Sequence, residues 1–159
     1  MLIREAGDED IDVVADLRLR FLAEHRGIDA ASFADGFRAS TVSFLRRHAA
    51  TRTGRSWLAE DDGAAAGVVT MLLLDLAPRP EDATGLEGYI VNMYVEPGAR
   101  RRGVGRSLLE ACLAAAHESG LRRLLLYATE SGEPLYVSVG FASNPRWMEL
   151  PVALAAPDA

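Results

Sequence analysis

The chain contains no lysine, and all 17 of its basic residues are arginine. This absence excludes every mechanism that needs a lysine amine, including Schiff-base chemistry, a phosphate-loop lysine and a lysine general base. Cysteine is nearly absent too, since Cys112 stands alone, which excludes an internal disulfide and a cysteine-based zinc site. Its neighbours Leu109 and Leu113 predict a small buried hydrophobe. A single cysteine fits a reducing compartment.

Long apolar runs are also missing. The longest, at 68–74, is too short to span a bilayer, and the first ten residues lack the apolar core of a signal peptide. We therefore expect a cytoplasmic protein without a membrane partner. The 23 acidic residues give a net charge of −6, which argues against nucleic acid as a partner. His25, His48 and His117 lack metal-ligand spacing, so no metal is expected.

What is present predicts one globular domain over residues 1–159, with 49% hydrophobic and 25% charged residues. Apolar spacing and turn residues predict helices and strands in alternation. The expected helices are 9–26, 32–48, 104–119 and 132–139, and the expected strands are 1–6, 56–60, 67–75, 87–95, 121–128 and 147–150. Strands 56–60 and 67–75 form a hairpin through Asp61-Asp62-Gly63. Strand 87–95, the next helix and strand 121–128 form a parallel βαβ unit, which indicates an α/β fold with helices on both sheet faces.

The loop between strand 87–95 and the following helix holds the densest positive charge of the chain. Its glycines have no side chain to block a ligand, the amides of the first helical turn are free, and the helix dipole adds partial positive charge. Arginines supply forked donors. We therefore expect a pyrophosphate to bind here, at Arg100, Arg101, Arg102, Gly103, Val104, Gly105, Arg106 and Ser107.

Two common nucleotide motifs do not fit this loop. Val104 stands where a phosphate loop requires lysine. A dinucleotide fingerprint needs a third glycine and a later acid, but leucines occupy both places, at 108–109 and 125–126. Taken alone, the glycine pair would equally suit a tight turn with solvated arginines.

A second motif gives the loop its context. The pattern Arg100-x-x-Gly103-x-Gly105 is followed, about 30 residues later, by Leu135-Tyr136-x-x-x-Gly140-Phe141. Together they resemble the GNAT superfamily of acetyl-CoA-dependent N-acetyltransferases. The resemblance implies a mixed, mostly antiparallel sheet of six to seven strands, with a central pair of splayed parallel strands and helices on both faces. It also implies acetyl-CoA as the acetyl donor, bound at the arginine loop.

The resemblance further implies how acetyl transfer would proceed. The backbone amides of Met93 and Val95 would bind the thioester carbonyl and the pantetheine arm. Tyr136 would act as general acid toward the CoA thiolate, its alternative being an ordinary buried tyrosine. Glu87 is a candidate base because even spacing on a regular strand places it on the face of Met93. Its alternative is a solvated glutamate, and other candidate bases are Asp75, Glu130 and Glu133.

The acceptor implied by the resemblance is an amine, attacked directly in a ternary complex. A small-molecule amine is our first expectation. A protein amino terminus or lysine is the alternative acceptor, and a CoA-binding sensor without catalysis is the alternative of another class. The sequence leaves open whether two copies of the chain form a homodimer. Two departures stand out: Ser131-Gly132 replaces an asparagine frequent in the family, and after Gly140-Phe141 one strand remains where the family has two.

Overall fold

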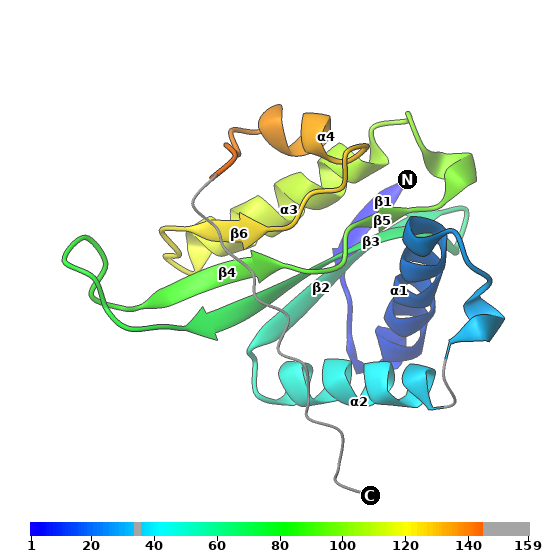
Figure 1. Cartoon of the computed structure of the whole chain (residues 1–159), viewed down its shortest axis with the longest axis horizontal. Helices are drawn as coiled ribbons and strands as arrows, with labels where there is room; N and C mark the ends of the chain where they lie inside the picture. Colours follow the sequence, from blue (N-terminus) through cyan, green and yellow to red (C-terminus); the bar gives the residue numbers. More distant parts are fainter. Residues whose placement is uncertain (34–35, 145–159) are drawn as a thin grey trace, which may run out of the picture. The chain divides into compact units, whose positions relative to one another are not determined.

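The computed structural model describes residues 1–33 and 36–144. Contacts divide the chain into two compact units, Met1–Tyr127 and Ala128–Ala159, and each is considered by itself. The first holds the whole described sheet (Figure 1). Its strands are β1 (Leu2–Glu5), β2 (Gly54–Asp61), β3 (Ala64–Asp75), β4 (Leu86–Ile90), β5 (Tyr94–Val95) and β6 (Leu124–Leu126). Its α-helices are α1 (Ile11–Arg26), α2 (Phe37–Ala50) and α3 (Val104–Glu118), with 3-10 turns η1 (Asp8–Asp10), η2 (Ala30–Ser32) and η3 (Pro97–Ala99). The second unit contributes α4 (Glu133–Val137).

The sheet has the order β1-β2-β3-β4-β6, and β5 pairs with β3 beyond the end of β4. All pairings are antiparallel except β4 with β6, which is parallel. The predicted fold class is therefore confirmed: a mixed, mostly antiparallel six-stranded sheet with one parallel pair. The βαβ unit β4–α3–β6 and the hairpin β2–β3 are confirmed as well. The strand predicted at 147–150 lies outside the described residues.

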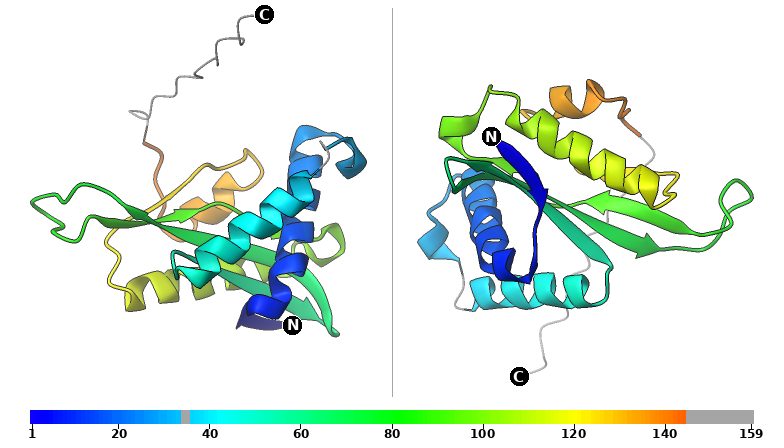
Figure 2. Two further views of the ribbon diagram at one scale, coloured as in Figure 1. Left: turned by 90° about the horizontal axis from the view of Figure 1, so that it is seen from below. Right: turned by 180° about the vertical axis from the view of Figure 1, so that it is seen from behind.

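The two faces of the sheet are covered by different helices. Leu58, Val68 and Tyr94 pack with the apolar side of α1 in the main core, and α2 lies beside α1 (Figure 2). Gly67, the neighbour of Val68, faces the other way, where a Cβ would lie 3.1 Å from Leu108 of α3. Helices thus cover both faces, as the sequence predicted.

Two predicted helices begin later than expected, and local backbone explains each shift. The segment before α1 forms the 3-10 turn η1, so the α-helix starts at Ile11. Helix α2 starts at Phe37 because Gly36, its N-cap, has φ +80, a left-handed conformation that interrupts a helix. The earlier residues form the separate turn η2.

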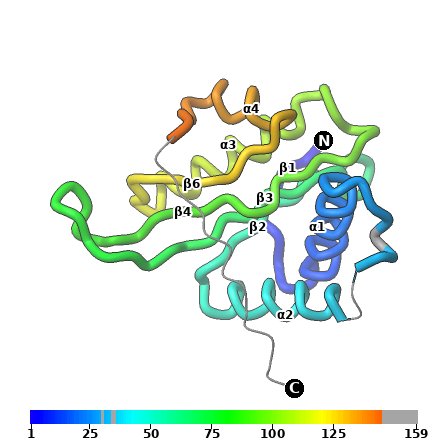
Figure 3. The backbone as a smooth tube through the Cα atoms, viewed as in Figure 1, coloured from blue at the N-terminus to red at the C-terminus, as the bar shows by residue number. Residues whose placement is uncertain are grey.

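The continuous strand predicted at 87–95 is wrong. Ile90 pairs with Met71 and Tyr94 pairs with Val68, so three residues, 91–93, oppose only two on β3. One extra residue of this kind is a β-bulge, which breaks the ladder and reverses the alternation of faces. The chain can be followed in Figure 3 from β4 through this break toward α3. We call residues 91–93 the strand break.

Candidate functional site

The arginine loop leads from β5 into α3 and presents unpaired backbone amides. Gly103 has φ +81 and serves as the N-cap of α3 without a side-chain hydrogen bond to the helix. The first helical bond runs from the Ser107 amide to the Gly103 carbonyl, 3.0 Å. The amides before it have no intrahelical acceptor. Val104 is buried and anchors the turn. Free amides at the start of a helix are donors that an anion can use.

Three of the four arginine side chains in this loop are held by carboxylates. Arg100 binds Glu24 at 2.6 Å, Arg102 binds Asp61 at 2.8 Å, and Arg106 binds Glu110 at 2.8 Å. Arg100 and Arg102 thereby tie the loop to α1 and to β2, whereas the pair of Arg106 lies within α3. Arg101 has φ 58 and makes no ion pair with the residues that the structure describes. The amides and Arg101 are therefore the groups most available to a phosphate.

The strand break opens one edge of the sheet beside this loop. The Glu96 amide donates to Ala66 of β3 at 2.9 Å, so Val95, the residue before it, directs its N–H away from β3. On that side β4 pairs with β6, but the pairing ends at Ile90 and Leu126. The Met93 amide forms no hydrogen bond with any described residue. The amides of Met93 and Val95, which the family resemblance implied as donors, thus lie at this edge without a backbone acceptor on β3.

Glu87 lies at the start of β4 and is buried, with 4% of its surface exposed. Its carboxylate contacts Arg79 at 2.7 Å and Arg123 at 3.4 Å. Even spacing on a regular strand predicted that Glu87 shares a face of the sheet with Met93. This prediction is wrong, because the strand break shifts the alternation of side chains between the two faces. The register instead places Glu87 on the face of Tyr94, the side that α1 covers.

Tyr136 belongs to the second unit, on α4. It is buried, and its ring meets Phe141 edge-on with 5.8 Å between the ring centres. The Tyr136 carbonyl accepts from the amides of Val139 and Phe141, both at 3.1 Å, which closes the short helix. The motif Leu135-Tyr136-x-x-x-Gly140-Phe141 is therefore a compact helix end, with Gly140 at φ +100. Thr129 helps begin this segment by accepting from the Gly132 amide at 3.1 Å.

Cys112 is fully buried in α3, as the sequence predicted. Burial raises the pKa of its thiol to about 12, because the thiolate would lose its hydration. A thiol in this state is a poor nucleophile at neutral pH. The cysteine therefore offers no covalent acyl carrier.

Arg18 was not among the site residues predicted from the sequence. This residue lies on the sheet-facing side of α1, where its guanidinium reaches the strand break and donates to the Val91 carbonyl at 3.2 Å. The sequence does contain a signal for it. Arg18 follows Ile11 by seven residues and Val14 by four, which places an arginine in the apolar stripe of the helix.

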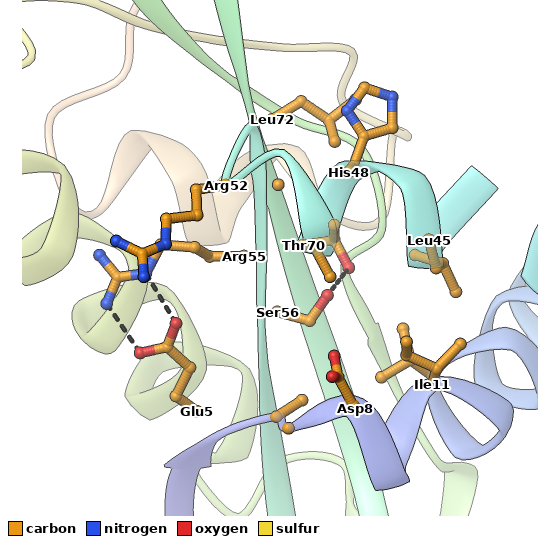
Figure 4. A pocket seen from close by; sticks show the side chains of 15 residues that line it. Glu5, Asp8, Ile11, Leu45, His48, Arg52, Arg55, Ser56, Thr70 and Leu72 are labelled. Atoms are coloured by element: carbon orange, nitrogen blue, oxygen red, sulfur yellow. Dashed lines mark hydrogen bonds and ion pairs between the residues drawn. The ribbon is translucent and has the colours of Figure 1, made fainter. Parts of the chain in front are cut away.

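A cavity of about 320 Å³ lies elsewhere in the first unit (Figure 4). Apolar side chains such as Leu45 and Leu72 line part of it, and the hydroxyls of Ser56 and Thr70 face each other there at 2.8 Å. None of its lining residues was predicted for the site. The lining includes no residue of the arginine loop or of the strand break, but the Thr70 carbonyl accepts from the Val91 amide of the strand break at 3.0 Å.

Comparison with known protein families identifies the family of this chain. The family model described as "Acetyltransferase (GNAT) family" matches residues 21–141. The chain belongs to the GNAT acetyltransferase family. The matched range includes the strand break, the arginine loop and the Tyr136 motif.

Solved GNAT-type structures share the fold along almost the whole chain. A predicted acetyltransferase with acetyl-CoA from Clostridium acetobutylicum superposes with a TM-score of 0.85 at 28% identity, covering 94% of both chains. A GCN5-related N-acetyltransferase from Ralstonia eutropha gives 0.83 at 28% identity, covering 95% of this chain and 97% of that one.

Curated relatives match only in part. Mycothiol acetyltransferase of Mycolicibacterium gilvum is 39% identical over 87 residues, which are 55% of this chain and 27% of that protein. The same enzyme of Beutenbergia cavernae is 36% identical over 88 residues, 54% of this chain and 27% of that protein. The chain thus spans about a quarter of the length of these relatives.

Neither a membrane helix nor a metal centre occurs in the described ranges. Residues 1–33 and 36–144 contain no helix long and apolar enough to cross a bilayer. In the same residues, no group of histidine, cysteine and acidic side chains could hold a metal ion.

Proposed function

We propose that this chain is an N-acetyltransferase that moves an acetyl group from acetyl-CoA to a small-molecule primary amine. The observation that carries the proposal is the pairing of two features on one stretch of chain. Unpaired amides at Met93 and Val95 lie at an open sheet edge, and the uncapped start of α3 follows within ten residues. Family membership and the acetyl-CoA in the Clostridium acetobutylicum structure support the same donor.

The loop fits the pyrophosphate of the donor for electrostatic reasons. The free amides from Gly103 to Arg106 and the helix dipole favour a negative charge at the start of α3. Arg101 is positioned to add a charged donor without breaking an existing ion pair.

The open sheet edge would both bind the thioester of the donor and stabilise the transition state of acetyl transfer. An amide of Met93 or Val95 aimed at the thioester carbonyl stabilises the negative charge that develops on oxygen when the amine attacks. Removal of one such donor costs about 3 kcal/mol in other enzymes. The amine then loses a proton as the carbon–sulfur bond breaks, and the CoA thiolate gains one.

Tyr136 is the residue that we propose as proton donor to the thiolate. A phenol with the ordinary tyrosine pKa remains protonated at neutral pH and can act as an acid. Glu87 stays our predicted base, directly or through water. Its Oε2 is buried 3.4 Å from Nη2 of Arg123 and accepts no hydrogen bond from any described residue, so it retains capacity to accept one.

We further propose that residues 1–159 act as one acetyltransferase domain, because the family match at 21–141 extends over both compact units. A small-molecule acceptor is favoured by the name of the curated relatives, mycothiol acetyltransferase.

The test is transfer itself. Purified protein is incubated with acetyl-CoA and a panel of primary amines, and both the released thiol and the N-acetyl product are measured. We expect thiol and product to appear together in equal amounts. In Tyr136→Phe we expect kcat to fall about 100-fold with the KM for acetyl-CoA nearly unchanged.

A matched control is Tyr127→Phe, which removes the same hydroxyl from a tyrosine that is 59% exposed and should leave kcat unchanged. Full activity of Tyr136→Phe would remove this tyrosine from the mechanism. Binding of acetyl-CoA without transfer to any amine would favour a non-catalytic CoA-binding module.

A further inference from the structure

Helix α1 turns an apolar stripe toward the sheet, and this stripe contains an arginine. Ile11, Val14 and Ala15 are buried on this side. Arg18 follows Ile11 by seven residues and Val14 by four, so it lies in the middle of the same stripe. A guanidinium placed there loses hydration, which costs free energy unless a partner compensates.

Among the described residues, Arg18 has no acidic partner of this kind. Its one hydrogen bond to a described residue joins Nη1 to the Val91 carbonyl at 3.2 Å, and no carboxylate of the described residues forms an ion pair with it. Desolvation lowers the pKa of Arg18 from its ordinary value, and no nearby acid opposes this effect. The other arginines that lack an ion pair in the described ranges, such as Arg26, Arg52 and Arg101, are exposed. Arg18 alone among them is half-buried.

The position of Arg18 links it to the proposed reaction. Val91 is the first residue of the strand break, two residues before Met93, whose amide is one of the proposed carbonyl donors. Two residues of extended backbone span about 7 Å. A group bound by Arg18 would therefore be separated from the reacting amine by only a few bonds.

Asn92 gives a second sign that the strand break lacks a polar partner. Its side chain is 1% exposed, and neither Oδ1 nor Nδ2 has a hydrogen-bond partner in the described structure. Buried amides are rarely left in this state. Two polar side chains thus meet at the strand break with hydrogen-bonding capacity left over: Asn92, which belongs to it, and Arg18, which reaches it from α1.

We propose that Arg18 binds a carboxylate of the acceptor, so that the acceptor is a small amine that also carries a carboxylate, as an amino acid does. The proposal rests on the acetyltransferase function proposed above. A guanidinium carries five N–H donors, of which the Val91 carbonyl uses one, and its planar fork matches a carboxylate. A carboxylate would compensate the charge that α1 leaves unpaired.

The experiment compares amines that differ only in this group. Each of several amino acids is offered with its carboxamide and its decarboxylated amine, and kcat/KM is measured for each. We expect the parent protein to prefer the acid over the carboxamide by about tenfold or more. In Arg18→Gln we expect the acid-to-amide ratio to fall to near one.

The matched control is Arg46→Gln, which removes an arginine that is 63% exposed and bound to Asp12 at 3.6 Å. It should keep the full ratio. A merely structural role of Arg18, holding the Val91 carbonyl, would lower the melting temperature of Arg18→Gln without changing the ratio. If Arg18→Gln does not fold, Arg18→Lys keeps the charge without the fork and should reduce the ratio in part.

Calorimetry with acetyl-CoA on the same preparations separates the two proposals. A parent protein that does not bind acetyl-CoA defeats the acetyltransferase function itself. A parent that binds acetyl-CoA but acetylates carboxamides as well as acids, or no carboxylate-bearing amine at all, overturns the role of Arg18 alone. An unchanged ratio in Arg18→Gln overturns it as well.

Discussion

Arg100, Arg102 and Arg106 stand in a motif that predicts phosphate binding, yet a carboxylate holds each side chain. The motif could be recognised from the sequence because glycine spacing and charge are local properties. The ion pairs of Arg100 and Arg102 could not, since Glu24 and Asp61 are distant along the chain and meet the loop only after folding. Among these residues the backbone, rather than arginine charge, is the part of the motif that stays free for a phosphate.

Cys112 yields a prediction at the same scale. Its thiol has a pKa of about 12 in the folded protein, so the reactive thiolate forms only well above neutral pH. With iodoacetamide at pH 8, we expect folded protein to be alkylated at least about 1,000-fold more slowly than an exposed thiol. Mass spectrometry over time measures the rate.

The same protein in guanidinium chloride provides the control, because unfolding hydrates the thiol and should permit complete single alkylation. Rapid labelling of the folded protein at pH 8 would show that α3 opens readily. It would also reopen the question of a cysteine acyl carrier.

At the scale of elements, the decisive feature is the strand break between β4 and β5. Its residues favour β structure, so the sequence predicts one continuous strand. The periodicity of a single segment cannot show that it has one residue more than the strand it pairs with. The insertion exists only relative to β3, where residues 91–93 oppose two partners. For the same reason the face of Glu87 was not predictable, whereas the β4–α3–β6 unit was, because its signals are sequential.

Close approach of β6 to β4 depends on Gly88. A Cβ at this position would lie 2.3 Å from Cδ2 of Leu124 and 3.1 Å from the sulfur of Met71. We expect Gly88→Ala to lower the free energy of unfolding by about 1–3 kcal/mol through overpacking, measured by urea denaturation.

Gly98→Ala is the matched control, because a Cβ there meets no atom within 4 Å and Gly98 lacks a positive φ. It should change the free energy of unfolding by less than about 0.5 kcal/mol. Equal effects of the two substitutions would contradict the close packing of β4 and β6.

At the scale of the whole molecule, a net charge of −6 coexists with a loop for which we propose phosphate binding. Long-range repulsion is screened within about 10 Å at 0.1 M salt, so local amides and charges decide whether a phosphate binds. The fold class and the proposed donor-binding loop could be predicted from the sequence, because the motif spacing indicates both. The proposed acceptor contact could not, since the role proposed for Arg18 depends on the strand that it contacts.

Both the proposed reaction and the proposed role of Arg18 require acetyl-CoA to bind at the start of α3, and calorimetry measures this binding. Gly105 has a helical backbone inside α3, so Gly105→Glu places a carboxylate at the helix start without the strain that the φ of +81 at Gly103 would impose. Ala114→Glu adds the same charge to an exposed position of the same helix, about 13 Å along its axis.

We predict that the parent and Ala114→Glu bind acetyl-CoA with similar affinity, and that folded Gly105→Glu binds at least about 30-fold more weakly. If the folded parent protein did not bind acetyl-CoA at millimolar concentration, or if the two variants bound it with equal affinity, the donor would not bind at the start of α3.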